Sequence, residues 1–152
     1  MTGEAPTDAD EREGAAIITA SWAGSAVFTV VAVIATIDPD SLGAPAVIVS
    51  LVLFAAGSAA MFWAFLIAVQ RSRTDAIGIG GLYFGAGSAP KGVQRQLMGS
   101  LAVQVLVALV TASIRVFTSL AFGILVPVWG LGLAGLWCAR YGEFSPRDGA
   151  AR

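Results

Sequence analysis

Four basic residues frame the only long polar segment that separates the apolar stretches of this chain. The segment covers residues 70–95, and its cations are Arg71, Arg73, Lys91 and Arg95. A cation near an anionic membrane surface contributes about 1 kcal/mol to binding. These residues are therefore candidates for contacts with anionic lipid headgroups or with a partner. Cytoplasmic loops of membrane proteins are enriched in Lys and Arg, so these four residues could also set the orientation alone and have no further role.

Two more polar residues lie within or beside an uncharged stretch, residues 96–114. Gln104 is inside it, where an interhelical hydrogen bond contributes roughly 0.6–2 kcal/mol, so we expect it to hold helices together. Arg115 follows its end. An ionisable residue at membrane depth suggests function, but a side chain near a helix end can reach the interface. Asp38 and Asp40 are available as counter-charges, and a structural ion pair is the favoured interpretation.

The residues that commonly carry catalysis are scarce. The chain has no histidine and a single cysteine, Cys138, which removes the commonest general base and any internal disulfide. Residues 130–135 read Gly-Leu-Gly-Leu-Ala-Gly, but they lie in an apolar stretch without the strand and acidic partner of a dinucleotide site. Close helix packing is the better interpretation. We expect no enzyme activity, no cofactor and no metal.

The composition indicates an integral membrane protein. Of 152 residues, 57% are hydrophobic and only 12% are charged, about half the share of charge that soluble domains carry. Lipid-facing surface removes the need for a polar exterior. The formal net charge of -1 and the small number of cations argue against a nucleic-acid partner.

Four apolar stretches are long enough to cross a membrane, because about 20 helical residues span the hydrocarbon core. We expect an all-α, integral membrane four-helix bundle, made of two antiparallel transmembrane hairpins joined by a Gly-rich cytoplasmic loop. The spans are predicted at residues 15–37, 46–69, 96–115 and 120–139, with the loop at 70–95. Pro127 should kink the last span. The flanking segments are a disordered acidic tail, 1–14, and a short C-terminal tail, 141–152.

The middle of the loop, residues 76–90, is uncharged but short and rich in glycine. It is too short for a span. We expect it to lie in the headgroup region or to fold against the inner mouth of the bundle, with a re-entrant dip as the alternative.

Orientation follows from the cations. The loop and the C-terminal tail hold most of the Lys and Arg residues, which places the loop and both termini in the cytoplasm of a protein of the cell membrane.

Two segments carry a resemblance to known proteins: GLYFGAGSAPKGVQRQLMGSLAVQ and LVPVWGLGLAGLWCARYGEFSPR, within residues 78–147. They resemble small uncharacterised four-span integral membrane proteins of actinobacteria. The resemblance implies a membrane location and the number of spans, and it transfers no active site.

The leading hypothesis is an accessory, assembly or interaction subunit of a membrane complex. Its partners would be membrane lipids, with anionic headgroups favoured, and another membrane protein or a second copy of the chain. The alternative is a small transporter or lipid-handling protein with an anion path that uses Arg115 and the loop cations.

Overall fold

The protein is an all-α bundle. The computed structural model describes the backbone of residues 8–147 and the side chains of residues 11–147. Its elements are α1 (Asp8–Ile37), α2 (Pro39–Arg71), α3 (Ile79–Phe84), α4 (Lys91–Ile114), the 3₁₀ helix η1 (Ser119–Leu125) and α5 (Pro127–Tyr141).

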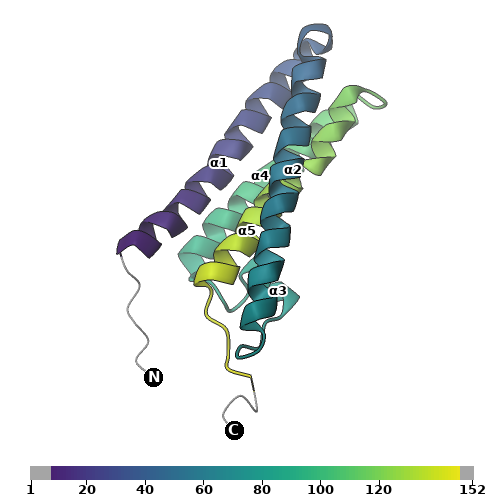
Figure 1. The fold of residues 1–152 in the computed structure, drawn as a ribbon. Helices are drawn as coiled ribbons and strands as arrows, with labels where there is room; N and C mark the ends of the chain where they lie inside the picture. Colours follow the sequence, from purple (N-terminus) through teal and green to yellow (C-terminus); the bar gives the residue numbers. More distant parts are fainter. Residues whose placement is uncertain (1–7, 148–152) are drawn as a thin grey trace.

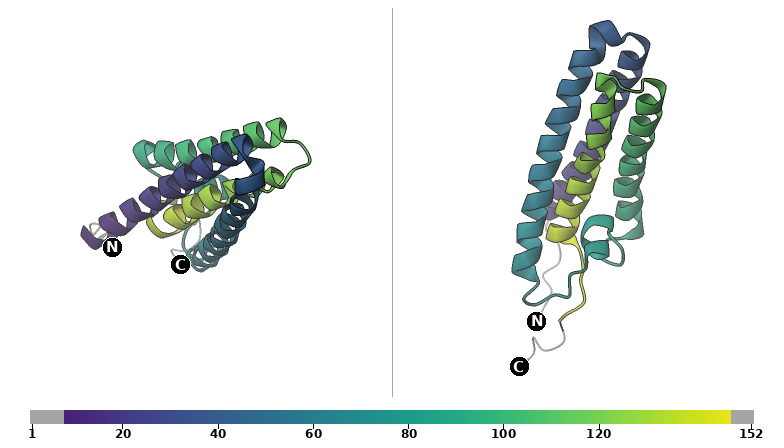
Figure 2. Two further views of the ribbon diagram at one scale, coloured as in Figure 1. Left: turned by 90° about the horizontal axis from the view of Figure 1, so that it is seen from above. Right: turned by 90° about the vertical axis from the view of Figure 1, so that its right-hand side faces the viewer.

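Four helical segments of the described chain are long and apolar enough to cross a membrane: Glu11–Ile37, Pro39–Arg71, Lys91–Ile114 and Ser119–Tyr141. They lie side by side, with α5 between the other long helices (Figures 1 and 2). The start of α1, the short helix α3 and the end of α5 all lie at one end of the bundle, which we call the loop end. These segments confirm the predicted four-helix bundle and are consistent with a multi-pass membrane protein.

The first hairpin is tighter than the sequence predicted. Helix α1 already begins at Asp8, so residues 8–14 are helical where we expected a disordered tail, and residues 1–7 lie outside the described residues. Acidic residues are favourable in the first turn of a helix because they complement its dipole. The predicted turn over residues 38–45 shrinks to Asp38, because Pro39 takes the first helical position, where no backbone N–H is needed. The Asp38 carboxylate accepts a hydrogen bond from the Ser41 backbone N–H at 3.3 Å.

The second hairpin also departs from the prediction. Helix α4 begins at Lys91, not at residue 96, so the loop ends at Pro90. The last span changes from the 3₁₀ helix η1, which ends at Leu125, to α5, which begins at Pro127, and Val126 between them keeps helical backbone angles. Proline lacks the N–H that a continuous helix would use and suits the first position of a new helix.

The centre of the bundle is built on glycines that bring backbones into contact. A Cβ on Gly132 of α5 would lie 2.2 Å from the carbonyl oxygen of Gly57 on α2, and one on Gly57 would lie 2.5 Å from the Trp129 backbone. A Cβ on Gly135 would lie 2.6 Å from the Tyr83 ring of α3. The glycine motif of residues 130–135 therefore serves helix packing, as predicted.

The loop folds against the mouth of the bundle, which was one of the three arrangements considered from the sequence. Leu82 of α3 is buried against Ala64 and Ala68 of α2 and Ala139 of α5. The Tyr83 hydroxyl donates to the Met61 carbonyl at 3.4 Å. Gly85 ends α3 with φ +63, a left-handed conformation that glycine adopts without steric cost.

Candidate functional site

Gln104 is fully buried and connects three helices through its amide group. Its Nε2 donates to the Ser25 hydroxyl of α1 at 2.7 Å. Its Oε1 accepts from the backbone N–H of Gly130 at 3.1 Å. Both ends of the amide are thus satisfied inside the apolar bundle, which is the helix-pairing role that the sequence predicted.

The Gln104 amide also provides an acceptor where the last span changes from η1 to α5. The Val126 carbonyl, four residues before Gly130, accepts from the Trp129 N–H at 2.8 Å. Gln104 supplies the acceptor of the Gly130 N–H instead, and an N–H without an acceptor is costly in lipid. The Ser25 hydroxyl continues the network to the Ser21 carbonyl at 2.9 Å, and the Ser21 and Ser100 hydroxyls bond each other.

Arg115 lies at the opposite end of the bundle from α3 and caps a helix. Its Nε and Nη2 donate to the Thr36 carbonyl of α1 at 3.1 and 2.9 Å. Thr36 belongs to the last turn of α1, where carbonyls lack partners and the dipole is negative. Neither Asp38 nor Asp40 forms an ion pair with Arg115 within the described residues. Arg115 thus contacts a carbonyl where the sequence suggested a carboxylate.

Arg71 ties the C-terminal segment to the bundle at the loop end. Its Nη1 and Nη2 donate to the carbonyls of Ala139 and Gly142 at 2.8 and 3.0 Å. It also pairs with Asp75 at 3.0 Å and lies 5.3 Å from the centre of the Phe144 ring. These partners occupy the guanidinium, so the structure places Arg71 in a structural network and not on the free surface.

The other three loop cations are exposed. Lys91 and Arg95 are four residues apart at the start of α4 and line a shallow hollow of about 570 Å³ with Gln94 and Met98. Arg73 follows α2 and is exposed. About 35 Å separates Lys91 from Arg115, given the rise of a helix of this length. The structure therefore does not bring together the residues of the predicted anion path.

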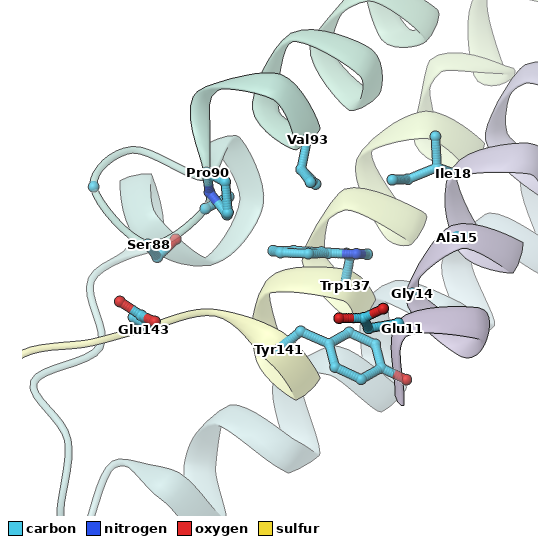
Figure 3. Close-up of a pocket in the computed structure, with 12 residues that line it drawn as sticks. Glu11, Gly14, Ala15, Ile18, Ser88, Pro90, Val93, Trp137, Tyr141 and Glu143 are labelled. Carbon is cyan, nitrogen blue, oxygen red and sulfur yellow. The ribbon is translucent and has the colours of Figure 1, made fainter. Parts of the chain in front are cut away.

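A larger hollow of about 660 Å³ opens at the loop end, and sequence reasoning missed it. We call it the Trp137 pocket. Trp137 and Tyr141 of α5 line it together with the start of α1, the start of α4 and the segment that joins α3 to α4. Figure 3 shows Trp137 among the lining residues, with Glu143 on one side and Glu11 on the other. The sequence signal was the four-residue spacing of Trp137 and Tyr141, which places both rings on one helical face.

The outward face of α1 has an uneven distribution of side-chain size. Within the part that is nearer the loop end, five exposed residues are small: Ala15, Ala16, Thr19, Ala23 and Ala26. We call this set the small face of α1. The larger Trp22 is also 39% exposed there. In the other part the exposed residues are bulky, for example Val33 and Ile34, which are 46% and 43% exposed. Large apolar side chains are the usual cover towards lipid, whereas small ones let another helix approach closely.

No family model, curated protein or solved structure matches this chain.

Proposed function

We propose that the protein is a non-catalytic accessory or assembly subunit that associates with another membrane protein through the small face of α1. The observation that carries this proposal is the exposure of Ala15, Thr19 and Ala23 at successive helical turns. Small residues at successive turns of a helix leave room for a partner backbone at close range.

The interior of the bundle supports an association role over a transport role. The buried amide of Gln104 is satisfied at both ends by Ser25 and Gly130. Gly57 and Gly132 bring α2 and α5 into backbone contact at the centre of the bundle. Polar groups that already bond each other in a closely packed interior offer no ready path for a solute.

The alternative, an anion path through Arg115 and the loop cations, receives less support. Arg115 is engaged by the Thr36 carbonyl, and Arg71 is engaged by Asp75 and two carbonyls. In this proposal the loop end lies at the cytoplasmic surface of the cell membrane. Lys91 and Arg95 contact anionic headgroups there.

The test is purification from native membranes in a gentle detergent, followed by intact-mass analysis of the bound components. We expect a stoichiometric second protein with the wild type and its loss with Ala23→Leu, which places a bulky side chain on the small face. Ala102→Leu is the matched control, because Ala102 is also exposed but lies on α4. A homo-oligomer that carries only anionic lipid, or equal retention of the partner by both variants, would overturn the proposal.

A further inference from the structure

The Trp137 pocket has the size and position of a ligand site. Its volume of about 660 Å³ lies within the usual range for small-molecule pockets. It lies where α1 begins and α5 ends, at the ends of two membrane-length segments. A compound with both apolar and polar parts would therefore reach it from the membrane interface.

The wall of the pocket is aromatic and fixed. Trp137 is 7% exposed and packs against Leu97, Ala134 and Cys138. The centres of the Trp137 and Tyr141 rings are 5.7 Å apart, with the ring planes at 51°. The face of an indole ring attracts cations, and tryptophan is the strongest of the aromatic side chains in this respect.

The charged residues that line the pocket, within the part of the chain that the structure describes, are negative. They are Glu11 and Glu143, and none of the described lysines or arginines lines it. Within the described residues neither carboxylate forms an ion pair, whereas the nearby Arg140 is paired with Glu13 at 3.5 Å. Ile18 and Val93 add an apolar part to the lining. Carboxylates beside an aromatic face and an apolar wall are complementary to an apolar cation.

We propose that the Trp137 pocket binds the positively charged head of an amphiphilic ammonium compound, with its apolar part against Ile18 and Val93. The head would lie between the Glu11 and Glu143 carboxylates and next to the Trp137 ring. Such a head belongs to an amine-bearing lipid or to a free amphiphilic cation. This inference does not depend on the association through the small face of α1, which shares only Ala15 with the pocket lining.

The experiment uses the full chain in neutral alkyl maltoside micelles and dodecylpyridinium as the probe, because pyridinium quenches tryptophan fluorescence on contact. Trp22→Phe and Trp63→Phe are present in every sample, including the reference called wild type here, because these two exposed tryptophans would report contact with the micelle. We expect saturable quenching in the wild type. The double variant Glu11→Gln with Glu143→Gln should bind the probe at least tenfold more weakly, since two charge interactions are lost. Val93→Phe should also weaken binding, because it fills the pocket while both carboxylates remain.

The control is Asp40→Asn, which removes one exposed carboxylate at the opposite end of the bundle. It should bind as the wild type does. Displacement of the probe by added phosphatidylethanolamine, but not by phosphatidylglycerol, would identify the lipid amine as the source. Saturable binding that neither lipid displaces would identify a free cation instead. Quenching that rises without saturation, and equally in all variants, would overturn the proposal, because it would show simple partition into the micelle.

Discussion

The Gln104 amide of α4 accepts a hydrogen bond from the Gly130 backbone N–H at 3.1 Å, just after the last apolar helical segment changes from η1 to α5. This contact joins two features that are separate in the sequence, a polar residue in one span and a proline in the next. The Val126 carbonyl bonds Trp129 instead of Gly130, so Gln104 gives the Gly130 N–H an acceptor inside the bundle.

Removal of this amide should destabilise the bundle. In Gln104→Leu, the Gly130 N–H and the Ser25 hydroxyl each lose a partner. We expect a loss of about 1–2 kcal/mol, measured as a lower thermal midpoint in detergent. The control is Gln96→Leu, which removes only an exposed hydrogen bond with Trp22. Equal shifts in the two variants would show that the buried contact contributes nothing.

A methyl group added between α2 and α5 should lower the stability of the bundle far more than one added at an open glycine. Gly132→Ala places a Cβ 2.2 Å from the Gly57 carbonyl oxygen. The helices must separate, at a cost of about 3 kcal/mol or more. Gly92→Ala is the matched control, since nothing lies within 4 Å of its added Cβ, and alanine is the better helix former. Unfolding followed by circular dichroism measures both, and a tolerated Gly132→Ala would contradict the packing.

Arg115 should behave as a cap and not as half of an ion pair. Arg115→Ala removes both hydrogen bonds to the Thr36 carbonyl, and we expect a loss of about 1 kcal/mol for this half-buried group. A double-mutant cycle with Asp38→Asn should give a coupling below about 0.5 kcal/mol. A larger coupling that weakens with added salt would restore the ion pair that the sequence suggested.

The loop cations should differ in their contribution to lipid binding. Lys91→Gln and Arg95→Gln remove exposed charges and should reduce the number of phosphatidylglycerol molecules retained in native mass spectrometry. Arg71→Gln should retain the lipid but lower the thermal midpoint, because Arg71 holds the carbonyls of Ala139 and Gly142. Loss of lipid from the Arg71 variant alone would reverse this assignment.

Tyr83 should titrate above its ordinary pKa. Burial at the mouth of the bundle raises the pKa of its phenol above 10.0 by disfavouring the charged form. The fold therefore gains stability from neutral Tyr83 below pH 10, and this gain is lost as the pH rises through the raised pKa. In a Tyr141→Phe background, ultraviolet absorbance of the phenolate follows Tyr83 alone. A midpoint at or below that of free tyrosinamide would contradict the burial.

The sequence by itself determined the number of spans, their approximate bounds and the location of the loop between two hairpins. Span length and apolar character are local properties that can be read from consecutive residues. The packing role of the glycines at residues 130–135 was also readable, because an apolar context excludes the strand that a nucleotide site requires. Ends of helices were less well predicted: Pro39 and Pro127 begin helices where the sequence suggested a turn and a kink.

Only the tertiary structure decided which polar groups meet. Ser25 and Gln104 are 79 residues apart, and no local pattern pairs them. The same holds for Arg115 with the Thr36 carbonyl and for Arg71 with the end of α5. The Trp137 pocket likewise forms from α1, α4, α5 and the segment that precedes α4. Backbone carbonyls are present at every residue, so the sequence cannot show which of them will lack a partner until the helices have packed.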